Sequence, residues 1–171
     1  MDVRVAALKE QDEDGHTIVH WMLMDGKKEI FNLIENLITP TRLYEIFEQK
    51  SSLDGFTVFH LAAENAQVCI FAAMATIMPW EDFCKLLEIK NSTGGDTPVH
   101  FASFQGHLNI VQCMLGDLSS DELTRLLGNK NNAGSTPLDE ARLSGSDHVV
   151  DYIESLLEIV GQLDGQLDED R

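Results

Sequence analysis

The sequence contains four copies of a glycine-x-threonine motif at nearly constant spacing. The copies begin at Gly15, Gly55, Gly95 and Gly134, so that successive glycines lie 40, 40 and 39 residues apart. A fixed period of this length is typical of repeat proteins, in which each repeat is one small supersecondary unit. The chain is therefore expected to fold as an array of four stacked repeats.

The segments that follow the glycines share an apolar pattern. Residues 97–102 read TPVHFA, residues 57–63 read TVFHLAA, and residues 106–111 read GHLNIV. These segments resemble the ankyrin repeat, which opens with Thr-Pro-Leu-His-x-Ala. The resemblance recurs in register from residue 12 to about residue 160. It implies an all-α ankyrin-repeat solenoid of helix-turn-helix repeats joined by turn or hairpin loops.

Each motif combines a tight turn with the start of a helix. Glycine adopts a positive φ readily, and the threonine two residues later can cap the helix that follows. Pro98 and Pro137 suit the first helical turn, where a missing N–H costs nothing. The pattern predicts first helices such as 58–65 and 98–105, and a second helix at 107–116. Helices this short must stack on neighbours to bury their apolar faces.

The period exceeds the usual ankyrin length of about 33 residues, and the surplus lies between the second helix and the next turn. Three such inserts align with one another, at 39–47, 78–87 and 118–127. We expect a short third helix in each, because apolar residues recur there at i, i+3 and i+4. The residues expected to pack on the stack are Leu43, Phe47, Phe83, Leu87, Leu123 and Leu127, whereas the role of Trp80 stays open. Ankyrin effectors of intracellular bacteria and IκB-like inhibitors have similar elaborations.

The ends of the array differ from its middle. Residues 1–11 are apolar enough to form an N-terminal cap, and the four repeats are expected at about 12–50, 51–90, 91–130 and 131–160. One domain, 1–163, is therefore followed by an acidic flexible tail, 164–171, which has little to bury. Repeats one and two lack the motif's proline, and Asn65-Ala66 replaces the usual glycine break, so we expect these repeats to be less regular.

The chain is strongly acidic, with 12 basic and 29 acidic residues and a net charge of −17. Nucleic acids and anionic membranes would be repelled by this charge, so neither is expected as a partner. A protein with a basic or amphipathic segment is the favoured counterpart. The alternative is that the acidity only keeps the molecule soluble.

The three cysteines, Cys69, Cys84 and Cys113, lie in apolar helical stretches without metal-binding spacing. They are interpreted as buried thiols in a reducing compartment. The sequence shows neither a charged-then-apolar leader nor an apolar run of the ~18 residues that a membrane span needs. A cytoplasmic location is expected, in the host cytoplasm if the protein is a secreted effector whose export signal lies outside this segment.

The recurring histidines His20, His60 and His100 are the strongest candidates for a metal site. Their equivalents lie one repeat apart, roughly 10 Å at ordinary helix packing distances, which is too far to share one zinc ion. The resemblance implies instead that they hydrogen-bond the turns between repeats. The sequence contains no catalytic motif of the common hydrolase, kinase or protease types. We expect no enzyme activity, no metal and no cofactor.

Protein recognition remains as the expected function. The resemblance implies binding through the concave face, which the turn tips and first helices form. The candidate partner-binding residues at these positions are His16, Met24, Asp25, Phe56, Glu64, Asn65, Asp96, Phe104, Gln105 and Leu143. Phe56 and Phe104 are the expected anchors, since large exposed aromatics surrounded by polar residues are typical of binding hot spots. The alternative for both rings is local packing against neighbouring turns.

Acidic residues around these positions, Asp14, Asp54, Glu64 and Asp96, would suit Arg or Lys on a partner. Two functions stay open: a non-catalytic module that binds a partner by itself, and a targeting or substrate-recruiting domain of a larger enzyme or effector. Nothing in the sequence requires a dimer, so a monomer is expected.

Overall fold

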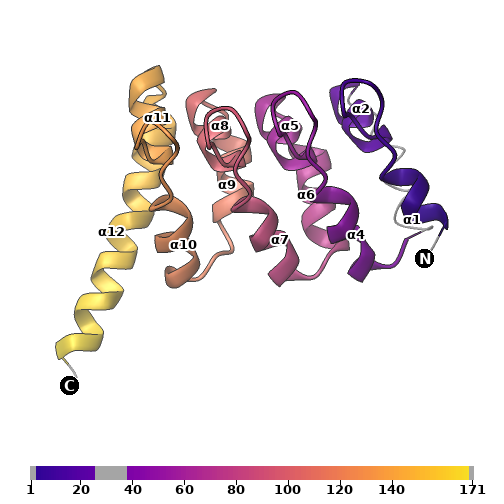
Figure 1. The fold of residues 1–171 in the computed structure, drawn as a ribbon. Helices are drawn as coiled ribbons and strands as arrows, with labels where there is room; N and C mark the ends of the chain where they lie inside the picture. The colour runs from indigo at the N-terminus through magenta and orange to yellow at the C-terminus, as the bar shows by residue number, and fades with distance from the viewer. Residues whose placement is uncertain (1–2, 26–37, 170–171) are drawn as a thin grey trace.

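The computed structural model describes residues 3–25 and 38–169, and these residues form helices without any strand. The first helices of the four repeats are α2 (Ile18–Met24), α5 (Val58–Glu64), α8 (Pro98–Phe104) and α11 (Pro137–Ser144). They stand side by side in one row (Figure 1), and each contacts the first helix of the next repeat. The predicted all-α ankyrin-repeat solenoid is confirmed.

The second helices form another row behind the first. They are α6 (Val68–Ile77), α9 (Leu108–Leu115) and α12 (Asp147–Glu169), and α9 contacts both of the others. The second helix of the first repeat would fall within residues 26–37, which lie outside the described residues. Ile70, Phe71 and Met74 of α6 and Ile110, Val111 and Met114 of α9 are buried between the rows.

The three predicted insert helices are present. They are α4 (Pro40–Phe47), α7 (Trp80–Leu87) and α10 (Ser120–Leu127), and they form a third row at the foot of the stack (Figure 1). Every insert residue predicted to pack on the stack is buried, at 6% exposure or less: Leu43, Phe47, Phe83, Leu87, Leu123 and Leu127. Before the first repeat, α1 (Val3–Leu8) packs on α4 and buries Val5.

The three rows meet in an aromatic cluster in the second repeat. Phe59 of α5 lies 5.0 Å from Phe71 of α6 and 5.4 Å from Phe83 of α7, measured between ring centroids. Phe47 of α4 lies 6.5 Å from Phe59. All four rings are fully buried. Burial of aromatic side chains in edge-to-face contact therefore joins the insert helices to the ankyrin helices.

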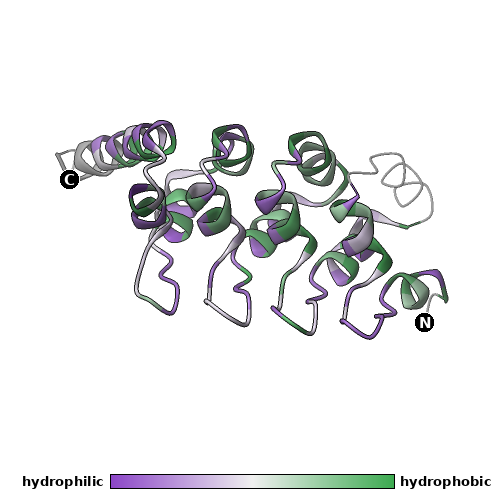
Figure 2. Cartoon of the chain, turned by 90° about the horizontal axis from the view of Figure 1, so that it is seen from above, coloured by the Kyte–Doolittle hydropathy of each residue, from purple (hydrophilic) through white to green (hydrophobic). Residues whose placement is uncertain are grey.

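The four turns project in the same direction from the stack (Figure 2). Their glycines Gly15, Gly55, Gly95 and Gly134 have φ of +76°, +73°, +69° and +83°. At Gly95 space is limiting as well, because a Cβ there would lie 2.4 Å from Asn132 Oδ1. At Gly134 no heavy atom lies within 4 Å of that position. The predicted positive φ is confirmed in all four turns.

Neighbouring repeats are also joined by side chains at the ends of the third helices. The Lys50 Nζ donates to the Lys90 carbonyl oxygen at 2.7 Å, and the Lys90 Nζ donates to the Lys130 carbonyl oxygen at 2.5 Å. The Gln11 Nε2 makes the equivalent bond to the Lys50 carbonyl oxygen at 2.7 Å. The nearly constant repeat length thus supports a regular series of side-chain to backbone bonds.

The break between the first and second helices is irregular in the second repeat, as expected. Ala66 has φ of +53°, whereas Gly106 and Gly145 occupy the equivalent position at +71° and +73°. A residue with a Cβ is strained in this region of the backbone map. Of the non-glycine residues that the structure describes, only Ala66 has a positive φ.

Two sequence predictions differ from the structure. The sequence predicts a buried Cys69, but this thiol is exposed on α6, while Cys84 is buried and Cys113 is intermediate. The helix α6 is apolar on nearly all sides, so its sequence does not reveal which side faces outward. In addition, α12 continues to Glu169, so the backbone is helical through most of the predicted tail.

Candidate partner-binding face

Three buried histidines hold the turns in place. The Nε2 atom of His20 lies 3.0 Å from the Phe56 carbonyl oxygen, that of His60 lies 3.0 Å from the Asp96 carbonyl oxygen, and that of His100 lies 3.1 Å from the Ser135 carbonyl oxygen. Each bond reaches from one repeat to the turn tip of the next. The role that the resemblance implied for these histidines is confirmed.

The other ring nitrogen of each histidine caps its own helix. In His60, Nδ1 accepts a hydrogen bond from the Thr57 N–H at 3.1 Å and lies 2.9 Å from Thr57 Oγ1. This leaves the proton on Nε2, which donates to the carbonyl of the next turn. Burial lowers the pKa of His60 to about 4, and burial also lowers the pKa values of His20 and His100. The network therefore requires neutral imidazoles.

The fourth repeat keeps the helix cap but not the bond to a following turn. Asp139 stands in the histidine position, and its Oδ2 accepts from the Thr136 N–H at 2.9 Å and from Thr136 Oγ1 at 2.8 Å. These bonds lower the pKa of Asp139. A carboxylate reproduces the helix cap, and among the described residues no fifth turn follows for an Nε2–H to reach.

We call the surface formed by the turn tips and the exposed side of α2, α5, α8 and α11 the inner face; it corresponds to the concave face that the ankyrin resemblance implies. Three apolar side chains at the ends of the first helices are exposed there: Met24 at 39%, Phe104 at 46% and Leu143 at 74%. Glu64 takes the equivalent position in the second repeat and is partly buried. This burial, followed by the charge of Asp54, raises the pKa of Glu64.

The remaining candidates lie close to these residues. Asp25 and Gln105 are the exposed C-caps of α2 and α8, and the Nδ2 of Asn65 donates to the Leu61 carbonyl oxygen at 2.9 Å. His16 is half-buried at the first turn tip, with its ring 5.4 Å from that of Trp21.

Phe56 is not the exposed anchor that the sequence predicts. It is only 8% exposed, because its ring stacks on His60 with centroids 5.4 Å apart and meets the edge of Phe101 at 4.8 Å. A turn-tip position allows either orientation of the side chain. Phe56 points inward because its ring packs against His60 of the second repeat and Phe101 of the third. Packing between repeats cannot be predicted from the pattern of a single repeat.

The acidic residues of the inner face differ in the hydrogen bonds that their carboxylates accept. Asp54 Oδ1 accepts from the Phe56 N–H at 3.0 Å and from the Ser51 hydroxyl, so it shapes its own turn. Asp14 is exposed at the first tip. Asp96 Oδ1 and Glu140 Oε1 accept from the same atom, Asn131 Nδ2, at 2.7 and 2.9 Å.

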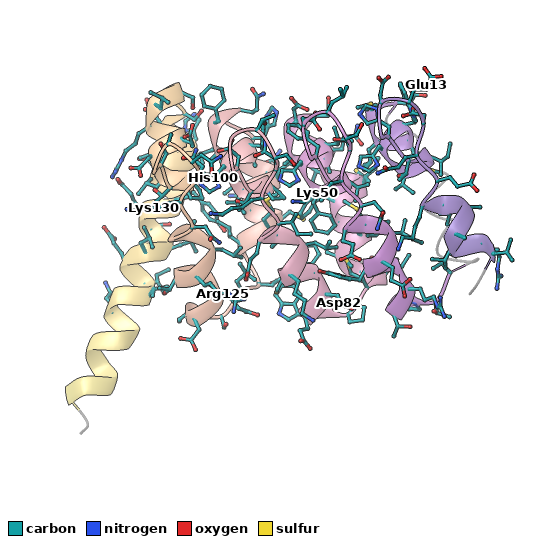
Figure 3. The ribbon with its side chains drawn as sticks, in the orientation of Figure 1. Glu13, Lys50, Asp82, His100, Arg125 and Lys130 are labelled. Carbon is teal, nitrogen blue, oxygen red and sulfur yellow. The ribbon has the colours of Figure 1, made fainter. Side chains whose placement is uncertain are left out.

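These last two carboxylates line a hollow between the third and fourth repeats. Its walls are Asp96, His100, Phe101, Phe104 and Glu140, and its volume is about 240 Å³. The hollow therefore combines two predicted binding residues, Asp96 and Phe104, with two that were not predicted from the sequence, Phe101 and Glu140. In Figure 3, His100 lies above the third row, on which Arg125 and Asp82 lie.

The missed residues share one position in the repeat. Trp21, Leu61, Phe101 and Glu140 directly follow the signature histidine or its replacement. Trp21 is 44% exposed, and its Nε1 donates to Asp12 Oδ2 at 2.6 Å. An alignment of the four repeats on the histidine would have identified this position, because it varies between aromatic, aliphatic and acidic side chains.

A second exposed aromatic lies away from the inner face. Trp80, 41% exposed, stacks on Phe83, and its Nε1 donates to Glu122 Oε1 at 3.3 Å. The Arg125 Nε pairs with Glu88 Oε1 at 2.5 Å between the same two insert helices. The Nε1 of Trp80 thus joins α7 to α10.

His20, His60 and His100 have no ring nitrogen left for a metal ion, since both nitrogens of each are hydrogen-bonded. Within residues 3–25 and 38–169, no three His, Cys, Asp or Glu side chains are grouped in a way that could hold a metal ion. No helix in that part of the chain combines the length and apolarity that crossing a bilayer demands.

Comparison with known proteins agrees with this geometry. The family model for the ankyrin repeat matches residues 94–122, which include the third turn, α8 and α9. No curated protein matches the chain. Among solved structures, a chain of the complex of yeast ribosomal protein Rps3 with its chaperone Yar1 is similar in fold, with a TM-score of 0.61 and 23% identity. The match covers 78% of this chain and 87% of that one.

The repeated turns, the histidine bonds between repeats and these matches lead to one assignment: the chain has the ankyrin-repeat fold, and its residues 94–122 match the ankyrin-repeat family.

Proposed function

We propose that this protein is a non-catalytic interaction module that binds a partner protein through its inner face. The observation that carries the proposal is the exposure of Met24, Phe104 and Leu143 at equivalent positions of three repeats. The stack does not need these side chains for its own core. Exposed apolar side chains within a polar surface are typical of interaction sites.

The charge of the face indicates the kind of partner. Asp96 and Glu140 line the hollow beside Phe104, Asp14 is exposed at the first turn tip, and the whole chain carries a net charge of −17. A basic or amphipathic segment would match both properties, with its cations opposite the carboxylates. Its association should slow as salt is added, because the attraction between opposite net charges is screened.

The solved neighbour supports a protein partner in general terms, since Yar1 is the chaperone of a ribosomal protein in that complex. The proposal also includes a cytoplasmic site of action, and a role as a bacterial effector or an IκB-like regulator is its most specific form. The identity of the partner decides between these roles.

The test is an affinity capture from cytosol with quantitative mass spectrometry. The baits are the wild type, the double variant Phe104→Ala/Leu143→Ala, and Trp80→Ala as a matched control for loss of an exposed aromatic elsewhere. We expect one protein to be retained by the wild type and by Trp80→Ala and to be lost with the double variant. Equal retention by all three baits would contradict binding through the inner face, and loss with Trp80→Ala alone would move the site to the third row.

A further inference from the structure

The hollow between the third and fourth repeats has the composition of a site for one cationic side chain. It is bounded by two carboxylates, Asp96 and Glu140, and by the rings of Phe101 and Phe104. Phe104 is 46% exposed, whereas Phe101 is half-buried and held at its edge by Phe56 and His60. Both rings belong to α8. Asp96 belongs to the third turn, and Glu140 belongs to α11, the first helix of the next repeat.

The carboxylates are fixed close to each other. Asn131 Nδ2 lies 2.7 Å from Asp96 Oδ1 and 2.9 Å from Glu140 Oε1. Each carboxylate keeps a second oxygen for another donor. Because one amide nitrogen reaches both carboxylates, the two groups lie close enough together for the forked N–H groups of one guanidinium to reach both.

The fifth wall of the hollow does not oppose a cation. His100 is fully buried with both ring nitrogens hydrogen-bonded, and burial lowers its pKa, so its ring is neutral near pH 7. The charge of Lys90 acts on this ring, but the Lys90 Nζ is itself bonded to the Lys130 carbonyl oxygen. The lining residues thus present negative charge and aromatic surface together.

We propose that this hollow binds an arginine side chain of the partner. The guanidinium is planar, so it can stack on the face of Phe104 while its N–H groups donate to Asp96 and Glu140. A lysine ammonium could satisfy the charge but could neither stack nor reach both carboxylates as a fork. This inference rests on the proposed function, and it specifies the anchor of the basic segment.

The probes are three capped pentapeptides that differ only in the central residue, which is arginine, lysine or citrulline, flanked by leucines. Backbone amide shifts are followed by NMR in the full chain. We expect the arginine peptide to shift the amides around residues 96, 101, 104 and 140. We expect the lysine peptide to bind at least about three-fold more weakly, and citrulline to bind least, because it lacks the charge.

Matched variants separate the two kinds of contact. Glu140→Gln keeps the oxygen that accepts from Asn131 but removes the charge, and Glu45→Gln on α4 is its control. Phe104→Leu keeps apolar volume but removes the ring. Each hollow variant should weaken arginine-peptide binding about three-fold, the scale of an exposed cation–π or ion-pair contact, and Glu45→Gln should not.

Absence of arginine-dependent shifts at these amides, or equal binding of the arginine and lysine peptides there, would overturn the arginine site. The proposed function would then be judged separately, by whether the Phe104→Ala/Leu143→Ala variant still loses the captured protein. Loss of that protein without any preference for arginine would leave an interaction module with a different anchor.

Discussion

His60 shows how one side chain can join two repeats at a cost in pH tolerance. Its neutral ring accepts at Nδ1 and donates at Nε2, and protonation would remove the acceptor in a fully buried site. Its pKa falls from 6.5 to about 4 on folding. The unfolded chain therefore binds the proton first, so stability is complete above pH 6.5 and is lost as the pH falls toward 4.

We expect the loss from His60 to reach about 3 kcal/mol near pH 4, with further losses from His20 and His100. Urea unfolding at pH 7.5, 6.5, 5.5 and 4.5 measures it. In His60→Gln the dependence of unfolding free energy on pH should be weaker over this interval. An unchanged dependence would mean that His60 does not resist protonation in the folded state.

Phe56 and Phe104 are aromatic residues of the same surface with opposite expected roles. Phe56→Ala should destabilise the fold by about 3 kcal/mol, because it removes a buried ring from the stack with His60 and Phe101. Phe104→Ala should leave the melting temperature nearly unchanged, since half of its ring is in solvent. Thermal unfolding of both variants checks this, and an equal loss in the two would contradict the assignment.

Ala66 carries strain that the other repeats avoid. Ala66→Gly should stabilise the protein by about 1 kcal/mol, the cost of a positive φ in a residue with a Cβ. Gly145→Ala is the reverse substitution at the equivalent position. It should lower the free energy of unfolding by a similar amount, because the added Cβ meets no atom within 4 Å and only the positive φ is unfavourable. Chemical denaturation of both variants tests the pair. Destabilisation by Ala66→Gly would show that contacts of the alanine methyl group outweigh the strain of its backbone.

At the scale of the element, the turns make the sharpest comparison. Gly134→Ala should lose about 1 kcal/mol from its positive φ alone. Gly95→Ala should lose distinctly more, because its Cβ would also lie 2.4 Å from Asn132 Oδ1 and 3.1 Å from the Asn132 backbone nitrogen. Urea unfolding of the two variants measures the difference. Equal losses would show that Asn132 moves away from the Cβ added at residue 95 at no cost.

The elements also show what the sequence could and could not predict. The insert helices were predictable because Leu123, Leu126 and Leu127 and their equivalents repeat at helical spacing, and because Ser119 and Glu122 form a capping box. The side of α6 that faces solvent was not predictable, since apolar residues occur on nearly every side of that helix. Periodicity identifies a helix, but its orientation is set by its neighbours.

The candidate site was predictable only in part for a similar reason. Asp96 and Phe104 follow from their positions in the repeat, and both line the hollow. Phe101 and Glu140 were missed, because their common position holds a buried leucine in the second repeat. A site between two repeats depends on which side chains the stacking brings together, and no single repeat contains that information.

At the scale of the whole molecule, the contacts that join the repeats are distinct from the side chains that the inner face exposes. Buried phenylalanines, histidine bridges and lysine-to-carbonyl bonds join each repeat to the next, so the inner face is left to display side chains that the fold does not need. The net charge of −17 adds a long-range attraction for a basic partner. We therefore expect that substitutions of the exposed apolar side chains on the inner face weaken binding of a partner protein and leave the stability of the stack nearly unchanged.

The most direct test is a calorimetric titration of the captured partner against the wild type and Phe104→Ala, with melting curves of both proteins. We predict a loss of more than about 1 kcal/mol in binding free energy, as for a hot-spot residue, with an unchanged melting temperature and a larger Kd at higher salt. Unchanged affinity in Phe104→Ala, or a loss of affinity that only follows a loss of stability, would contradict binding through the inner face.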